Sequence, residues 1–77
     1  MADPEKLPHI SGREAVKAFE RAGWTVKRRQ GGHIILGKAG MRYNLSVPDH
    51  RQLKDGTLRS LIRKAGLTVG EFIELLR

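Results

Sequence analysis

Residues 24–47 read WTVKRRQGGHIILGKAGMRYNLSV, and the fold follows from this stretch. Two glycine-containing segments, 30–32 and 37–40, divide it into three runs rich in apolar, β-branched and aromatic residues. Because glycine reaches positive φ at little steric cost, such segments are typical of tight turns between strands. We therefore predict an antiparallel sheet whose three strands cover residues 24–29, 33–36 and 41–47.

The alternation of side chains predicts which face of this sheet is packed. In the first run, Trp24 and Val26 should share the packed face, which leaves Lys27 and Arg29 on the solvent side. Trp24 and Tyr43 are thus expected in the core rather than on a base-stacking surface. Pro48 should end the third strand, whose packed face would consist of Met41, Tyr43, Leu45 and Val47.

A helix should precede the sheet. Ser11 and Glu14 have the spacing of a capping box, in which each side chain satisfies a free backbone N–H at a helix start. Apolar residues then recur at helical spacing up to Gly23, so the expected helix covers about residues 12–22. Residues 1–9 contain two of the three prolines and are expected to form a flexible lead-in to a single domain over 10–77.

Two further helices should follow the polar loop that begins at Pro48. Thr57 is placed to cap the first of them, and Gly66 to end it. Thr68 and Glu71 repeat the capping-box spacing and predict a short third helix. The expected class is α+β: a helix, a three-stranded antiparallel sheet, a helix and a short C-terminal helix.

Length and composition narrow the classes of function. A chain of 77 residues makes one small domain. It has no cysteine, which excludes disulfides, thiolate metal sites and thiol nucleophiles. It also lacks a signal-peptide pattern and an apolar run of the roughly 18–20 residues that span a bilayer. We therefore expect a cytoplasmic protein with no membrane partner.

The chain is strongly basic, with 15 Lys and Arg against 8 Asp and Glu and a net charge of +7. The excess lies within residues 11–77, so a basic face is expected rather than a basic tail. Such a charge attracts polyanions, which points to nucleic acid or an acidic protein as partner. Improved solubility is the simpler alternative.

Candidate phosphate-binding side chains lie on the sheet and on the second helix. Three cations of the strands would give the wet sheet face a positive charge suited to phosphates. Three more lie close together on the second helix. Both groups could instead be ordinary solvated surfaces, and the charge pattern alone does not separate the two readings. The first group is Lys27, Arg29 and Arg42, and the second is Arg59, Arg63 and Lys64.

His33 is the strongest candidate for chemistry. It opens the second strand directly after Gly31 and Gly32, which would let a ligand approach the backbone closely. A neutral imidazole there could take a proton from an RNA 2′-hydroxyl, whose oxygen would then attack the adjacent phosphate. Nearby cations would stabilise the added charge. The alternative for a histidine at a strand end is a packing or hydrogen-bonding role.

Other chemistries find little support. His50 follows Asp49 in the polar loop and could pair with a phosphate or a carboxylate. The spacing of His33, Asp49 and His50 matches no recognisable metal site, and no nucleotide-binding motif is present. We therefore expect no metal and no cofactor.

Four motifs together resemble the HicA (YcfA-like) toxins of bacterial and archaeal toxin–antitoxin pairs, over about residues 10–77. The resemblance implies a fold like that of double-stranded-RNA-binding domains. It also implies a metal-independent endoribonuclease that cleaves mRNA and is blocked by a cognate HicB-like antitoxin. The motifs are Gly31-Gly32-His33, Val47-Pro48-Asp49-His50, Gly56-Thr57-Leu58-Arg59-Ser60-Leu61-Ile62 and Ala65-Gly66-Leu67.

The same resemblance assigns roles to individual residues. It implies that His33 is the catalytic histidine. Gly32 stands where the family usually has serine, and we include it among the expected RNA contacts. His50 matches a second histidine often found after the Val-Pro pair, and we include it as well. The alternative function is a non-catalytic RNA-binding module.

Overall fold

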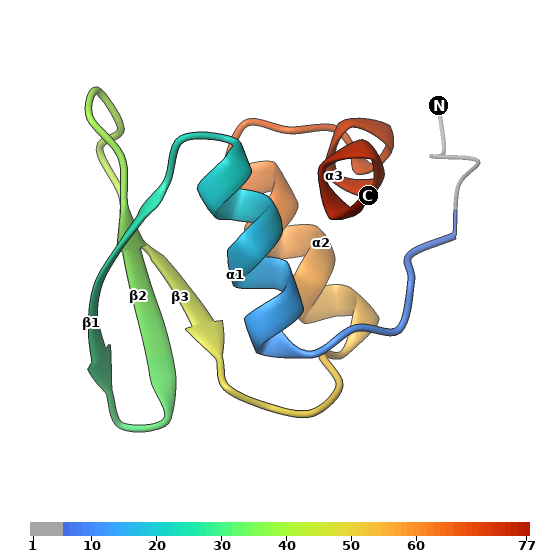
Figure 1. Cartoon of the computed structure of the whole chain (residues 1–77), viewed down its shortest axis with the longest axis horizontal. Helices are drawn as coiled ribbons and strands as arrows, with labels where there is room; N and C mark the ends of the chain where they lie inside the picture. Colours follow the sequence, from blue (N-terminus) through green and yellow to red (C-terminus); the bar gives the residue numbers. More distant parts are fainter. Residues whose placement is uncertain (1–5) are drawn as a thin grey trace.

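The three strands form one antiparallel sheet in the order β1-β2-β3 in a computed structural model, which describes residues 6–77. β1 covers Thr25–Gln30, β2 covers His33–Gly37 and β3 covers Leu45–Pro48. Figure 1 shows all three helices on one side of this sheet. Within the described residues, no helix or strand covers the other face, which we call the open face. The predicted α+β class is confirmed.

Helix α1 (Gly12–Arg21) begins where the sequence predicts, with both hydrogen bonds of the Ser11–Glu14 capping box present. Its first residue packs directly against the end of β3. The Gly12 N–H donates to the His50 carbonyl at 2.9 Å, and a Cβ at position 12 would collide with the carbonyl oxygen of Pro48. A glycine is therefore required for α1 to approach β3 this closely.

The core lies between the helices and the sheet, and residues from every helix contribute to it. Phe19 of α1 and Phe72 of α3 (Val69–Leu76) are fully buried, with ring centroids 5.1 Å apart. Trp24 is 2% exposed, so its predicted place in the core is confirmed. The expected lead-in over residues 1–9 falls partly outside the described residues, but Leu7 within it is buried in the core.

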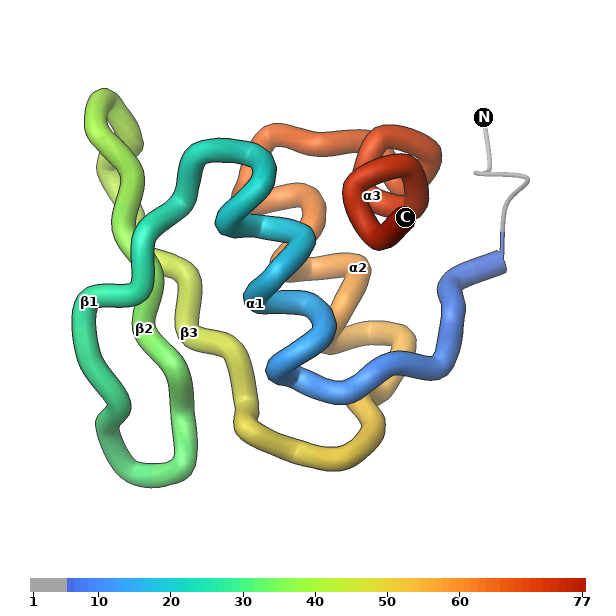
Figure 2. Tube along the Cα trace, viewed as in Figure 1, coloured from blue at the N-terminus to red at the C-terminus, as the bar shows by residue number. Residues whose placement is uncertain are grey.

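The third strand is shorter than predicted. The chain leaves β2 at Gly37 and makes a turn in which the Met41 N–H donates to the Lys38 carbonyl at 3.0 Å. It rejoins the sheet only at Leu45, so residues 38–44 form a loop that projects past the strands (Figure 2). Leu45 and Val47 are buried as predicted. Met41 is 37% and Tyr43 62% exposed, so their predicted place in the core is wrong.

A β-bulge changes the faces of β1. Val26 pairs with Leu36, but Arg28 pairs with Ile35, so Lys27 is an extra residue in the ladder. Paired residues share a face, and Ile35 does not belong to the core cluster beneath the helices. The bulge therefore turns Arg28 toward the open face.

Arg29 consequently lies on the other face. It pairs with Ile34, which is buried against the helices. The prediction that Arg29 belongs to the solvent-facing side of the sheet is therefore wrong. The error arises because strict alternation assumes a ladder without an inserted residue.

Helix α2 (Asp55–Lys64) begins two residues before the predicted cap. Its N-cap is Lys54, which makes no side-chain capping hydrogen bond. Thr57 lies inside the first turn, so its predicted role as cap is wrong. The carboxylate of Asp55 in this turn complements the helix dipole instead. The second predicted capping box, Thr68 with Glu71, is confirmed at the start of α3.

None of the helices in residues 6–77 has the length and apolar character needed to cross a membrane.

Candidate functional site

His33 stands at the end of a tight hairpin and is exposed. It pairs with Gln30 across a two-residue turn, in which Gly31 has φ +57° and Gly32 has φ +79°. Positive φ at both central residues is typical of a type I′ turn, which only glycine and a few polar residues adopt easily. His33 Nδ1 lies 3.2 Å from the Gly31 carbonyl oxygen. When Nδ1 donates to that oxygen, Nε2 is the unprotonated nitrogen and can accept a proton.

Arg28 is the cation that the bulge brings to the face of His33. Its Nε donates to Gln30 Oε1 at 2.9 Å, and Gln30 is the direct cross-strand partner of His33. Alternation along β2 places His33 on the open face together with Ile35, the partner of Arg28. Sequence reasoning did not select Arg28, because no residue type in β1 marks the position of the bulge.

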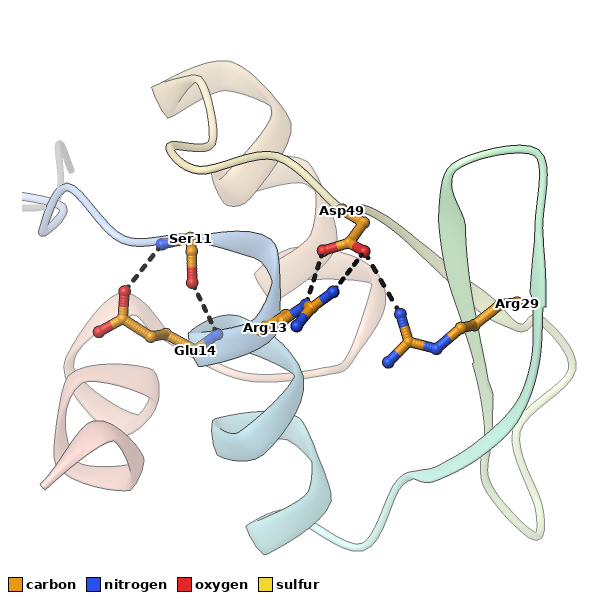
Figure 3. A network of polar contacts seen from close by, with 5 residues as sticks. All are labelled: Ser11, Arg13, Glu14, Arg29 and Asp49. Carbon is orange, nitrogen blue, oxygen red and sulfur yellow. Dashed lines mark hydrogen bonds and ion pairs between the residues drawn. The ribbon is translucent and has the colours of Figure 1, made fainter.

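Arg29 belongs to an ion-pair group on the helix side of the sheet (Figure 3). Its Nη1 lies 3.3 Å from Asp49 Oδ2, while Arg13 of α1 approaches the same carboxylate with Nε 3.1 Å from Oδ1. The hydrogen bond from Arg13 lowers the pKa of the Asp49 carboxyl; burial opposes this shift, and the charges of Arg13 and Arg29 add to it. The same hydrogen bond raises the pKa of Arg13.

The loop after β3 holds the hairpin turn and α1 together. The Asp49 N–H donates to the Gly32 carbonyl at 2.9 Å, and the next residue, His50, accepts from Gly12. The His50 side chain is exposed and lines a shallow surface hollow with Ser11, Arg13, Asp49 and Arg51. Within residues 6–77, no hydrogen bond joins His50 to His33.

Lys27 and Arg42 lie away from the hairpin turn. A Cβ at Gly37 would lie 2.7 Å from Lys27 Cε and 3.2 Å from Asn44 Oδ1, so the Lys27 stem crosses the open face at the far end of β2. Arg42 is exposed in the loop over residues 38–44. Neither side chain is therefore brought next to His33.

The three cations of α2 separate into two groups. Lys64 Nζ lies 5.8 Å from the centre of the Tyr43 ring, on the side of α2 that faces β3. At about 100° per residue, Arg63 and Arg59 project about 100° and 140° around the helix from Lys64. Arg59 is half-buried and Arg63 is exposed. Of the predicted helix group, only Lys64 adjoins the sheet.

A groove of about 420 Å³ runs between β3 and α2. One side is Ser46, which alternates with the buried Leu45 and Val47 and so faces the open side of the sheet. The other side is a polar strip of α2. Sequence reasoning did not anticipate this groove, whose lining residues are Ser46, Gly56, Thr57, Ser60, Leu61 and Lys64.

Of the predicted site residues, His33 and Gly32 lie next to each other at the hairpin turn. Arg28, and not the predicted Arg29, shares the open face with His33. Lys64 joins the groove beside β3, while Arg29 and His50 belong to the helix side. No three His, Asp or Glu side chains within residues 6–77 are grouped so that they could hold a metal ion.

The family described as HicA toxin of bacterial toxin–antitoxin matches residues 12–67, so the chain belongs to the HicA family. Among solved structures, it is similar to a chain of a toxin–antitoxin complex from Streptococcus pneumoniae. The two are 32% identical with a TM-score of 0.68, over 75% of this chain and 98% of that one. No curated protein matches the chain.

Proposed function

We propose that this protein is an endoribonuclease toxin that cleaves mRNA without a metal ion, with His33 as the proton-transferring side chain. The observation that carries the proposal is the exposed imidazole of His33 at the hairpin end of the open face. Membership of the HicA family supports it, because the resemblance of Gly31-Gly32-His33 to the family motif assigns the catalytic role to this position.

The proposed reaction begins with a proton transfer from an RNA 2′-hydroxyl to the unprotonated nitrogen of His33. The 2′-oxygen then forms a bond to the adjacent phosphorus, and the bond from phosphorus to the 5′-oxygen of the next nucleotide breaks. The leaving 5′-oxygen takes up a proton from water, and His33 then releases its proton to the solvent. The products are one RNA end with a 2′,3′-cyclic phosphate and one with a 5′-hydroxyl. Nε2 is suited to this role when Nδ1 donates to the Gly31 carbonyl.

Positive side chains on the same face would stabilise the charge that develops on the phosphate. Arg28 is best placed for this among the described cations, since it is bonded to the cross-strand partner of His33. Lys27 would guide flanking phosphates along the open face, and Lys64 would do so at the β3 edge of the sheet. Arg29 is engaged by Asp49 on the other side of the sheet, so we assign it a structural role.

Gly32 replaces the serine that the family usually carries before the catalytic histidine. Its backbone already supports the site, because its carbonyl accepts from Asp49 and its φ of +79° forms the turn. The missing hydroxyl would remove one contact to RNA or to the imidazole. We therefore propose an active enzyme that is slower than a relative with serine at this position.

The proposed protein partner is a HicB-like antitoxin that blocks the site. The structural neighbour is described as a toxin–antitoxin complex, and this chain has a net charge of +7 that suits an acidic partner. Expression of the toxin alone should arrest growth, and co-expression of the antitoxin encoded beside it should restore growth.

The test of the proposal combines growth with RNA cleavage. Expression of the wild type should slow growth, and purified protein should cut mRNA in excess chelator, whereas His33→Ala should do neither. His9→Ala is the matched control, because His9 is also exposed but lies before α1. Salt-dependent RNA binding without cleavage by the wild type would favour the alternative, a non-catalytic RNA-binding module. Absence of both cleavage and growth arrest would overturn the toxin proposal.

A further inference from the structure

Tyr43 is the most exposed large apolar side chain of the described residues, with 62% of its surface open to solvent. It lies two residues before Leu45, which is fully buried and holds this end of the loop in place. Lys64 of α2 positions its ammonium 5.8 Å from the ring centre. The ring is therefore held on the surface by a cation while most of its area stays accessible.

The groove beside this ring has the lining that a sugar–phosphate backbone needs. The hydroxyls of Ser46, Thr57 and Ser60 can donate hydrogen bonds, and Lys64 supplies a positive charge. None of the six lining residues is acidic. In contrast, the hollow on the helix side of the sheet contains Asp49, whose carboxylate already binds two arginines. The groove thus offers hydroxyl groups and one ammonium group with no acidic side chain among its lining residues.

The groove lies at the β3 edge of the sheet, and Ser46 is the lining residue that it shares with the face of His33. Ser46 pairs with Ile35, and Pro48 pairs with His33, so Ser46 and His33 belong to neighbouring rungs of the open face. Two residues along a strand span about 7 Å. A nucleotide chain bound at His33 can therefore reach the groove by way of Ser46.

We propose that Tyr43 stacks on an unpaired base of the RNA strand cut at His33, while the groove holds the sugar and phosphate of that nucleotide. The proposal rests on the proposed function and adds a base-stacking contact at Tyr43, which requires an unpaired stretch of the RNA. Aromatic side chains stack on bases of any sequence, but only where the base face is not covered by its neighbours in a duplex. Lys64 serves both parts of the nucleotide, because it contacts the ring and lines the groove.

The experiment measures binding of a single-stranded 2′-O-methyl oligonucleotide, which lacks the attacking hydroxyl and stays intact. Tyr43→Ala should weaken binding about tenfold, as expected for the loss of one base stack, whereas Tyr43→Phe should bind like the wild type. Met41→Ala is the matched control, because Met41 lies in the same loop and is 37% exposed. The chain contains a single tyrosine, so its ring protons give one set of NMR signals that stacking should shift upfield.

The buried Trp24, the only tryptophan, reports by its fluorescence that each variant is folded. The stacking proposal is overturned if Tyr43→Ala binds as tightly as the wild type and the tyrosine signals do not move. It is also overturned if Tyr43→Ala keeps its RNA affinity but loses the antitoxin, which would assign the ring to the protein partner. Absence of oligonucleotide binding by every variant, including the wild type, would overturn the proposed function itself. A duplex of the same sequence should leave the tyrosine signals in place.

Discussion

The backbone N–H of Asp49 donates to the carbonyl oxygen of Gly32 at 2.9 Å, so the loop after β3 is joined to the residue that precedes His33. The Asp49 side chain extends the same connection to α1 and β1 through its contacts with Arg13 and Arg29. One residue thus links the hairpin turn to the helical layer. The position of the histidine depends on this link as well as on the sheet.

Asp49→Asn should lower the unfolding temperature near neutral pH. The pKa of Asp49 is lower in the folded protein than its ordinary value, so its ion pairs stabilise the fold above the unfolded pKa of about 4. This contribution is lost as the pH falls through the folded-state pKa. Thermal unfolding of the two proteins should therefore differ at pH 7 and converge in strong acid. The difference should be small, because the arginine side chains are 68% and 62% exposed.

A double-mutant cycle tests whether the stability change of Asp49→Asn comes from the ion pair with Arg13. Arg13→Ala should lower the free energy of unfolding less in the Asp49→Asn protein than in the wild type, since both substitutions remove the same ion pair. Additive effects of the two substitutions would contradict the coupling between them.

Gly12→Ala should destabilise the protein by about 1–3 kcal/mol, because its methyl group would overlap the Pro48 carbonyl oxygen. Gly56→Ala is the matched control within α2, where a Cβ meets no atom within 4 Å. That substitution should stabilise the helix by about 0.5–1 kcal/mol. Denaturant unfolding measures both free energies. Equal stability of Gly12→Ala and the wild type would show that α1 does not require this close approach.

Phe72→Ala should cost about 3–5 kcal/mol, as expected for a fully buried aromatic ring. Helix α3 lies outside the residues matched by the family, yet Phe72 packs 5.1 Å from Phe19 in the shared core. Glu74→Ala on the exposed side of α3 should change the free energy of unfolding by no more than about 0.5 kcal/mol. Similar values for the two variants would mean that α3 is a dispensable addition.

Gly32→Ser should lower the free energy of unfolding and raise the rate of RNA cleavage. A serine at φ +79° is strained and should cost about 1–2 kcal/mol of unfolding free energy, although no atom lies within 4 Å of the new Cβ. Under the proposed function the hydroxyl adds a contact to RNA or to the imidazole, so the rate of RNA cleavage per folded molecule should rise. A lower rate in the folded variant would show that the turn geometry matters more than the hydroxyl.

The local signals of the sequence predicted the elements well. Both capping boxes begin a helix, because each depends only on side chains three residues apart. The glycine pair at 31–32 predicted the first hairpin for a similar reason, since two adjacent positive φ angles favour glycine. The position of His33 at the start of β2 could therefore be predicted from the sequence.

The surroundings of His33 were harder to predict from the sequence, because they depend on pairing between strands. The inserted residue at Lys27 exchanges Arg29 for Arg28 on the open face, and no local pattern marks it. Tyr43 has the spacing of a packed strand residue, but β3 begins only at Leu45. Alternation predicts a face only where a partner strand is present. Sequence reasoning thus predicted the position of His33 in β2, but neither Arg28 on the same face nor the groove between β3 and α2.

The most direct test of the central claim is the single-turnover rate of RNA cleavage by His33→Ala relative to the wild type, in excess chelator. Binding of the 2′-O-methyl oligonucleotide and Trp24 fluorescence establish that the variant is folded and still binds RNA. We predict a rate lower by a factor of about 10²–10⁴, the usual contribution of a general acid–base group, with affinity nearly unchanged. Equal cleavage rates for the two folded proteins would contradict the assignment of His33 as the catalytic residue.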